Sequence, residues 1–198
     1  MRGALIAFEG LDQSGKQTQA ERLRDVLLAE GRQVRFLSFP EYSTAIGAEI
    51  GRALAGERDY GSDTIQLLYI ANRYERRADM AGWLAAGDIL ICDRYLASSV
   101  AYGMAFGLDR DWLLDTQRFL PPPTLTMLLD IQPETAVARK QHDRDRYERD
   151  LALQNRVRGC YHELAAHLPH WTVLDGERSK DVIHADVVTA VRAALARP

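Results

Sequence analysis

The sequence is short of several features that would place a protein in a specialised class. Only 3 of its 198 residues are lysine, against 22 arginines, and acidic residues outnumber basic ones to give a net charge of −3. This balance excludes the overall basic field of a protein that wraps DNA or RNA, so no nucleic-acid partner is expected. Because arginine is so abundant, a cluster of arginines is by itself weak evidence for a site.

Cysteines and long apolar runs are also scarce. The two cysteines, Cys92 and Cys160, lack metal-site or C-x-x-C spacing, and Cys92 lies in an apolar run that indicates a buried thiol. Free thiols fit a reducing compartment. No signal peptide opens the chain and no apolar run is long enough to span a bilayer, so we expect a cytoplasmic protein with no membrane partner.

The sequence does contain a regular alternation of apolar runs and helical segments. Strands are predicted at Ala4–Phe8, Val34–Ser38, Ile89–Cys92, Leu125–Ile131 and Trp171–Leu174. Helices are predicted at 16–30, 43–55, 63–86, 95–103, 110–119, 134–142, 146–167 and 180–196. No strand alternates cleanly between apolar and polar residues, so both sheet faces are expected to be covered. We predict that residues 1–198 form one α/β domain, a doubly wound five-stranded parallel sheet flanked by helices.

The first strand leads into a glycine-lysine loop. In the segment LIAFEGLDQSGKQTQ, Gly10, four residues and then Gly15-Lys16 have the spacing of a phosphate-binding loop. Glycines let backbone N–H groups turn inward, the following helix start adds a positive dipole end, and Lys16 reaches the outer phosphates. A plain glycine turn is the alternative. Gln17 stands where Ser or Thr would contact Mg²⁺, and Thr18 is one position late.

Polar residues follow other strands at the edge where ligands bind in such sheets. The third strand ends in Asp93-Arg94. Beside a phosphate loop, Asp93 would hold Mg²⁺ or its waters, and Arg94 suits a planar contact with phosphate. The alternative is a solvated strand end with a local ion pair.

A charged segment at residues 139–149 reads RKQHDRDRYER. We interpret it as a lid whose arginines close over transferring phosphates, because phosphoryl transfer needs mainly positioning and charge neutralisation. A solvated surface turn in an arginine-rich chain is the alternative.

Tyr69 and Arg73 lie four residues apart in a helical segment and therefore share a face. An aromatic ring beside a hydrogen-bonding arginine could stack on a nucleobase and read it. The alternative is a core tyrosine beside an exposed arginine.

The chain resembles the thymidylate kinases, the dTMP-phosphorylating branch of the P-loop nucleoside monophosphate kinases. The segments that carry the resemblance are FEGLDQSGKQTQ at 8–19, FPEYSTAIG at 39–47, LLYIANRYE at 67–75, DRYLASSVAY at 93–102 and DRYERDLALQNRVRGCYHELA at 145–165. They span most of the chain in the family's order. The resemblance implies a fold of the P-loop NTPase type with a lid, and transfer of the γ-phosphoryl group of ATP to dTMP with Mg²⁺ as cofactor.

By matched position, the resemblance also implies which residues bind ATP. The donor site would consist of Gly10, Leu11, Asp12, Gln13, Ser14, Gly15, Lys16, Gln17, Thr18 and Arg139. Of these, Arg139 would stack on the adenine. Asp93 would hold Mg²⁺ through water, with Gln17 or Thr18 as a further ligand.

The residues expected to bind dTMP follow in the same way. They would be Asp12, Phe39, Tyr42, Tyr69, Arg73, Arg94, Ser99 and Tyr102. Tyr69 would stack on thymine, Arg73 would bond its carbonyl and Ser99 would read its polar edge. Arg94 would hold the phosphate, and Tyr102 would lie against the sugar and disfavour a 2′-hydroxyl.

The residues expected to act on the transferring group are Asp12, Lys16, Asp93, Arg94, Arg144 and Arg146. The chain departs from the family at three places. Gln13 is not the loop arginine of some members, so the lid arginines must supply that charge. Gln17 replaces Ser or Thr, and Gly103 replaces the glutamine that commonly follows Ala-Tyr.

Two other functions remain open from the sequence. One is a thymidine kinase acting on the nucleoside, and the other is a non-catalytic P-loop module that binds nucleotide. The family resemblance further implies a homodimer, for which helical stretches around 43–55 and 63–86 could supply the contact.

Overall fold

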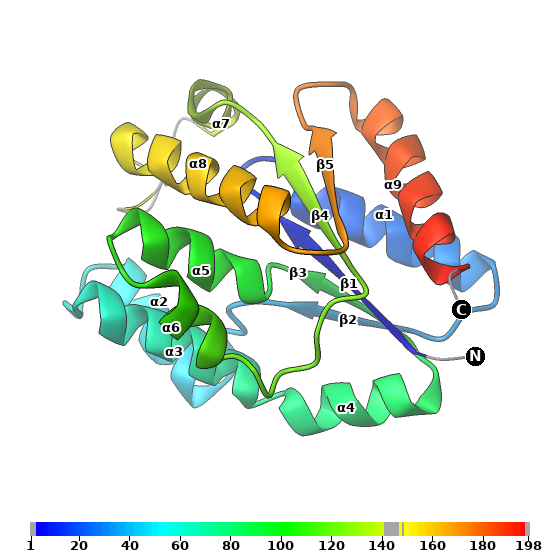
Figure 1. Ribbon diagram of the computed structural model, residues 1–198, viewed down its shortest axis with the longest axis horizontal. Coiled ribbons are helices and arrows are strands. Elements are labelled where there is room, and N and C mark those ends of the chain that lie inside the picture. Colours follow the sequence, from blue (N-terminus) through cyan, green and yellow to red (C-terminus); the bar gives the residue numbers. More distant parts are fainter. Residues whose placement is uncertain (1–2, 141–146, 148, 197–198) are drawn as a thin grey trace.

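Five parallel strands form the centre of the molecule, which the computed structural model describes over residues 3–140, 147 and 149–196. The strands are β1 (Ala4–Glu9), β2 (Val34–Ser38), β3 (Ile89–Asp93), β4 (Leu125–Asp130) and β5 (Trp171–Asp175). They pair in the order β2-β3-β1-β4-β5, and every neighbouring pair is parallel (Figure 1). The predicted α/β fold with a five-stranded parallel sheet is confirmed. The order reverses beside β1, which is where such sheets bind ligands.

The centre of the sheet is covered more completely than its edges. All residues of β1 and β3 are buried, whereas Val173 in edge strand β5 is 47% exposed. An edge strand has one neighbour only and lies at the margin of the covering helices. The prediction that both faces are covered is therefore right for the central strands and wrong for the edge strands.

The helices alternate with the strands largely as predicted. They are α1 (Lys16–Ala29), α2 (Ala45–Leu54), α3 (Ser62–Tyr74), α4 (Arg77–Ala86), α5 (Leu96–Ala105), α6 (Arg110–Asp115), α7 (Pro133–Arg139), α8 (Leu151–His167) and α9 (Lys180–Leu195). None of the helices in these described ranges has both the length and the apolar character needed to cross a membrane.

The predicted single helix at 63–86 is wrong, because two helices occupy that range. Arg76, with φ −98° and ψ 0°, leaves the helical conformation between α3 and α4. The turn lets Met80 of α4 pack, fully buried, against Leu5 and Leu90 of the sheet. Burial of that apolar side chain favours the break over a continued straight helix.

Three other predicted helix boundaries also differ. Helix α8 begins at Leu151 instead of residue 146, because the Asp150 side chain accepts a bond from the Leu153 N–H at 2.9 Å and caps the helix there. Helix α6 ends at Asp115 instead of 119, since turns lead from it into the following prolines. Helix α7 ends at Arg139, and Lys140 is extended.

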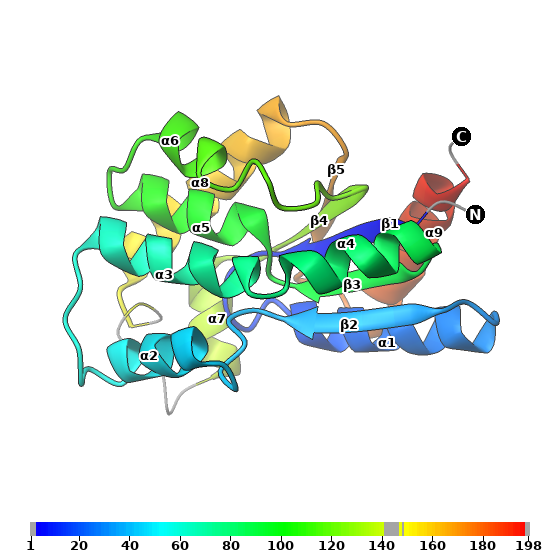
Figure 2. The same cartoon turned by 90° about the horizontal axis from the view of Figure 1, so that it is seen from below.

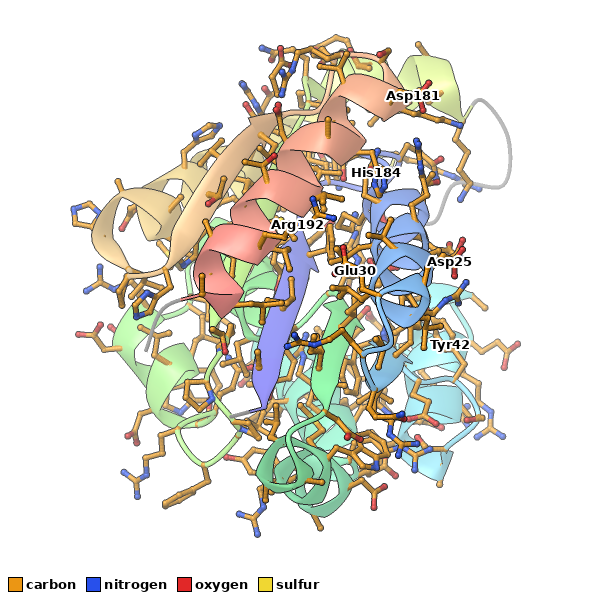
Figure 3. All side chains as sticks on the ribbon, turned by 90° about the vertical axis from the view of Figure 1, so that its right-hand side faces the viewer. Asp25, Glu30, Tyr42, Asp181, His184 and Arg192 are labelled. Atoms are coloured by element: carbon orange, nitrogen blue, oxygen red, sulfur yellow. The ribbon has the colours of Figure 1, made fainter. Side chains whose placement is uncertain are left out.

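The helices form two layers because alternate residues of each strand point to opposite faces. Ile6 and Phe8 of β1 pack in a cluster with α1 and α9, while Leu5 and Ala7 pack in a cluster that includes Met80 of α4. Helices α5 and α8 cover the rest of that second face. Figure 3 shows α1 and α9 side by side, with Glu30 and Arg192, which form an ion pair, between them.

Helices α2 and α3 lie beyond the carboxyl ends of the strands, with α3 beside α5 (Figure 2). The chain passes to them from the end of β2 and returns through α4 to the start of β3. The phosphate-type loop after β1 faces the same edge. The sheet therefore brings the loop and this helix pair together, which is what builds the site.

Candidate active site

The loop between β1 and α1 has the backbone of an anion-binding turn. Gly10 has a φ of 138°, and a Cβ on it would lie 2.5 Å from the carbonyl oxygen of Leu129 on β4, so only glycine fits. Gly15, with a φ of 93°, directly precedes α1 and has no side chain to cap it. The N–H groups at the start of α1 can therefore serve an anion.

Lys16 is folded back onto this loop. Its Nζ donates to the carbonyl of Leu11 at 2.7 Å and lies 3.4 Å from Ser14 Oγ, and its side chain is buried. Burial, together with the neighbouring charge of Arg94, lowers the pKa of Lys16 to about 8 against the pull of nearby carboxylates. An ammonium group held in this way gains stability when phosphate oxygens replace the loop carbonyl as its partner.

A cavity opens over the loop and the start of α1, and we call it the loop cavity. It is lined by Asp12, Gln13, Ser14, Gly15, Lys16, Gln17, Thr18, Gln19, Asp93, Arg94, Arg139, Gly176, Arg178, Lys180 and Ile183. Arg139 bridges its two sides, because its guanidinium donates to the carbonyls of Gln13 at 3.0 Å and Gly176 at 2.9 Å. Eight of the ten residues predicted to bind ATP line this cavity.

The other two predicted ATP residues do not line the loop cavity. Gly10 lies beneath the loop against Leu129. The Leu11 side chain is buried in the apolar cluster of α5 and α8, and only its carbonyl serves the site, by holding Lys16.

Asp93, at the end of β3, suits a hydrated cation. It is buried, it lines the loop cavity, and its Oδ1 has no hydrogen-bond partner among the described residues. A buried carboxylate oxygen without a partner is costly, and a cation or its water would satisfy it. Gln17 is exposed and donates to Glu21 at 2.9 Å, while Thr18 is half-buried in the same cavity.

Within the described ranges, no group of three or more histidine, cysteine or acidic side chains could hold a metal alone. A cation beside Asp93 would therefore need phosphate oxygens and water as further ligands. That is how Mg²⁺ is usually held with nucleotides.

An ion pair between Asp12 and Arg94 closes one end of the loop cavity. Arg94 Nη2 lies 2.6 Å from Asp12 Oδ1, and its Nη1 donates to the Gly10 carbonyl at 3.2 Å. Burial raises the pKa of Asp12, but the charges of Arg94 and Lys16 outweigh it and lower that pKa to about 2. Arg94 has a φ of 61°, a left-handed conformation that non-glycine residues rarely adopt outside functional sites.

A second cavity lies on the other side of this ion pair, and we call it the aromatic cavity. It is lined by Asp12, Phe39, Pro40, Tyr42, Leu54, Gln66, Tyr69, Arg73, Arg94, Ser98, Ser99, Tyr102 and Tyr147. All eight residues predicted to bind dTMP are among them. Asp12 and Arg94 line both cavities, so the two spaces adjoin at one charged boundary.

Arg73 is the buried charge of the aromatic cavity. It is 2% exposed, its Nη1 donates to Ser99 Oγ at 2.7 Å, and its Nε has no partner among the described residues. Burial lowers the pKa of Arg73 from its ordinary value. The alternative of an exposed Arg73 is wrong. A guanidinium held in this way offers a spare donor to a polar ligand edge.

Glu9 supports the site from within the sheet. It is fully buried, and its carboxylate accepts bonds from the backbone N–H of Tyr95 at 2.8 Å and from the hydroxyls of Ser98 at 2.6 Å and Tyr161 at 3.1 Å. The carboxylate thus caps the start of α5, the helix that carries Ser99 and Tyr102.

Several lining residues were missed by the sequence analysis. Arg178 and Lys180 follow β5 and line the loop cavity, and applying the strand-end argument to the fifth strand would have found them. Gln66 lies one and two helical turns before Tyr69 and Arg73, is 2% exposed, and its Oε1 has no partner among the described residues. Its helical spacing was the available signal.

Two predicted residues cannot be placed. Arg144 and Arg146 lie outside the described residues. Of their neighbours in the charged segment, Arg139 lines the loop cavity and Tyr147 lines the aromatic cavity, where its ring packs against Phe106 with centroids 5.6 Å apart.

Gly103 does not line either cavity. A Cβ on it would lie 2.6 Å from Leu113 Cδ1, so the glycine lets α5 pack closely on α6. A glutamine side chain at this position would require Leu113 to move.

Comparisons with known proteins agree with this geometry. A family model described as thymidylate kinase matches residues 8–187. The human thymidylate kinase is 34% identical over 203 residues, covering all of this chain and 95% of that protein. A probable thymidylate kinase of Pyrococcus horikoshii is 34% identical and covers 97% of each chain. A solved structure of thymidylate kinase from Candida albicans superposes with a TM-score of 0.83 at 29% identity, covering 97% of this chain and 92% of that one.

Proposed function

This chain belongs to the thymidylate kinase family, and we propose how its two cavities perform the reaction of that family. The chain is an enzyme that transfers the γ-phosphoryl group of ATP to dTMP, giving dTDP and ADP. The observation that carries the assignment of sites is the adjacency of two chemically different cavities. One is lined by a phosphate-type loop and the other by aromatic rings, and the Asp12–Arg94 pair lies between them.

ATP occupies the loop cavity in this proposal. The N–H groups at the start of α1 receive the phosphates, and Lys16 exchanges its loop carbonyl for the outer phosphate oxygens. Arg139, which reaches across the cavity from the end of α7, packs against the adenine. Arg178 and Lys180 add positive charge on the far side.

Mg²⁺ fits beside Asp93, whose buried Oδ1 lacks a partner among the described residues. When bound, the ion would neutralise charge on the phosphate oxygens. Thr18 and Gln17, which both line the same cavity, are the candidates for a further ligand.

dTMP occupies the aromatic cavity. Its phosphate lies at Arg94, next to the terminal phosphate of ATP, and its base lies between Phe39 and Tyr69, with Arg73 donating to a base carbonyl. Ser99, bonded to Arg73, faces the same edge of the base. Tyr42 borders the ligand, and Tyr102, whose hydroxyl bonds Asp12 at 3.3 Å, lies against the sugar.

The enzyme needs no general base, because the acceptor phosphate is already an anionic nucleophile. The work of the protein is to hold two anions together and to neutralise the charge that develops between them. Lys16 and Arg94 do this from opposite sides. The lid arginines Arg144 and Arg146 complete the positive surroundings.

The test is acceptor selectivity. With ATP and Mg²⁺, ADP formation should be much faster with dTMP than with dCMP, AMP or GMP, and equal rates would remove the assignment of the aromatic cavity to thymine. Thymidine serves as a further acceptor. It lacks the phosphate that Arg94 holds, so a thymidine rate equal to that of dTMP would contradict the role of Arg94.

Three wider expectations remain predictions. The family resemblance favours a homodimer, with α2, α3 and α4 as candidate contacts, which sedimentation of the purified chain would test. A single domain and a cytoplasmic location are likewise expected from the sequence.

A further inference from the structure

Asn72 is a buried polar residue for which the sequence analysis gave no role. It is fully buried on α3, directly before Arg73, and it does not line the aromatic cavity. A buried amide must be fully hydrogen-bonded to be tolerated. Its partners therefore indicate what it holds in place.

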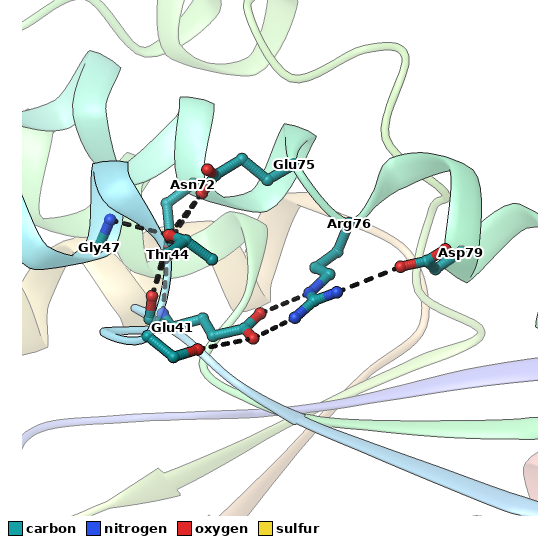
Figure 4. A network of polar contacts seen from close by, with 8 residues as sticks. Glu41, Thr44, Gly47, Asn72, Glu75, Arg76 and Asp79 are labelled. Carbon is teal, nitrogen blue, oxygen red and sulfur yellow. Dashed lines mark hydrogen bonds and ion pairs between the residues drawn. The ribbon is translucent and has the colours of Figure 1, made fainter.

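The side chain of Asn72 holds the backbone of Glu41, in the loop after β2 (Figure 4). Asn72 Oδ1 accepts from the Glu41 N–H at 2.7 Å, and Nδ2 lies 3.4 Å from the Glu41 carbonyl. The same Nδ2 donates to Thr44 Oγ1 and to Glu75 Oε2, each at 2.9 Å. One amide thus joins the loop to α3.

Arg76 holds the side chain of the same loop residue. Its guanidinium makes two bonds to the Glu41 carboxylate, one of them 2.6 Å from Nε, and it also pairs with Asp79 at 3.3 Å. Glu41 is therefore fixed twice, through its backbone by Asn72 and through its carboxylate by Arg76 (Figure 4).

Thr44 extends this attachment to α2. Its Oγ1 accepts from the Gly47 N–H at 3.0 Å and so caps the helix, and it lies 2.7 Å from Glu75. A Cβ on Gly47 would lie 1.8 Å from the Glu41 carbonyl oxygen, so α2 is packed directly on the loop. We call Glu41, Thr44, Asn72, Glu75 and Arg76 the clamp.

The clamp joins two walls of the aromatic cavity, each of which comes from a different part of the chain. Phe39, Pro40 and Tyr42 of the loop, with Leu54 at the end of α2, form one wall, and Gln66, Tyr69 and Arg73 of α3 form the other. No member of the clamp lines the cavity itself. The clamp therefore ties the two walls together from outside the cavity.

We propose that Asn72 is a positioning residue that sets the separation of these walls and thereby the fit of the acceptor nucleotide. The inference rests on the assignment of the aromatic cavity to dTMP. When the walls are already ordered, less conformational entropy is lost as dTMP binds. Loosening the walls therefore weakens dTMP binding and leaves ATP binding unchanged.

The main test is Asn72→Asp, which keeps the acceptor for the Glu41 N–H but puts a carboxylate oxygen where Nδ2 donated. That oxygen faces Glu75 and the Glu41 carbonyl, so repulsion replaces attraction. We expect the KM for dTMP to rise about 10-fold, on the scale of one or two buried hydrogen bonds. The kcat at saturating dTMP and the KM for ATP should change less than about 3-fold.

A second substitution in the same protein should reverse the effect of Asn72→Asp. In Asn72→Asp with Glu75→Gln, the new amide can donate to the carboxylate at position 72, so the KM for dTMP should return to within about 3-fold of the parent value. Glu75→Gln alone supplies the second single-variant KM for dTMP from which the coupling between positions 72 and 75 is calculated. The matched control is Asn155→Asp, an exposed asparagine on α8 that should leave both KM values unchanged.

Other results would overturn the proposal. An unchanged KM for dTMP in Asn72→Asp, or a lower kcat at constant KM with no rescue by Glu75→Gln, would mean that Asn72 only stabilises the fold. If Asn72→Asp does not yield folded protein, Arg76→Gln, at a side chain that is 35% exposed, replaces it, and an unchanged KM for dTMP there would be equally decisive.

Arg73→Ala separates this proposal from the site assignment beneath it. A raised KM for dTMP in Arg73→Ala together with no effect of Asn72→Asp would reject the clamp alone. An unchanged KM for dTMP in Arg73→Ala would reject the aromatic cavity as the dTMP site, and the clamp proposal with it.

Discussion

The two cavities of this protein are built in different ways. Eight of the residues that line the loop cavity are consecutive, from Asp12 to Gln19, and the main donors there are backbone N–H groups and one lysine. The aromatic cavity takes side chains from the loop after β2, from α2, α3 and α5, and from Tyr147. A cavity made of consecutive backbone is a local property of the chain, whereas one made of distant side chains depends on how the elements pack.

This contrast predicts that substitutions at the Asp12–Arg94 boundary, which the two cavities share, reduce activity most. Arg94→Ala removes the one cation that lines both cavities among the described residues, and it leaves the Asp12 carboxylate without its 2.6 Å partner. We expect kcat/KM for dTMP to fall by about 10³-fold, with both kcat and the KM for dTMP affected. Steady-state kinetics would check this beside the control Arg110→Ala, at a half-buried arginine that lines neither cavity. A change in the KM for ATP alone would contradict the comparison.

Lys16→Ala should affect the loop cavity only. Turnover should fall by about 10²-fold or more, because the charge that meets the transferring phosphate is lost, while the dissociation constant of dTMP and the melting temperature stay nearly unchanged. Rapid-quench turnover and dTMP titration measure the two quantities. Near-normal turnover would show that the loop is not the ATP site.

Tyr69→Ala should have the opposite signature. Loss of the ring from the aromatic cavity should raise the KM for dTMP about 10-fold and leave the KM for ATP unchanged, since stacking on a base contributes about 1–3 kcal/mol. Tyr69→Phe keeps the ring and is the matched control. Equal effects of the two variants would mean that the hydroxyl, not the ring, is what the ligand contacts.

Arg144 and Arg146, for which we propose a lid role, sharpen the comparison in another way. Arg144→Ala or Arg146→Ala should lower turnover about 10-fold and change dTMP affinity less, because a lid arginine acts mainly in the closed complex. Single-turnover rates compared with dTMP titrations would separate the two effects. A loss of dTMP affinity with normal turnover would argue against the lid role.

The smallest expected effect is the uptake of part of a proton when Mg·ATP binds. Since the pKa of Lys16 is lowered to about 8, roughly half of the free enzyme lacks this proton at pH 8, and contact with the anionic phosphates of Mg·ATP should raise the pKa and draw a proton in. Near pH 6.5 the ammonium is already formed, so uptake should vanish. Calorimetry in buffers of different ionisation enthalpy should show up to about half a proton taken up at pH 8. The Lys16→Arg variant carries a side chain that is always charged, so it should bind Mg·ATP without taking up a proton.

Sequence reasoning was most successful where chemistry is local. Gly10, Gly15 and Lys16 could be assigned because their spacing alone defines the loop, and Tyr69 and Arg73 because helical periodicity puts them on one face. The break between α3 and α4 was missed, because the burial of Met80 against the sheet decides it and no local residue marks it. Gln66, Arg178 and Lys180 were missed for a different reason, because the arguments from helical spacing and from strand ends were not carried through to them, although all three line the cavities.

The sequence by itself determined the alternation of strands and helices and the loop that begins the site, because hydrophobic periodicity and glycine backbone freedom act over a few residues. The tertiary structure alone decided the boundary between the two cavities and which side chains line the aromatic cavity. Asp12 and Arg94 are 82 residues apart, and Asn72 reaches Glu41 across 31 residues. Such contacts exist only once the strand order has brought the carboxyl ends of β1, β2 and β3 to one edge and set α2 and α3 beyond it.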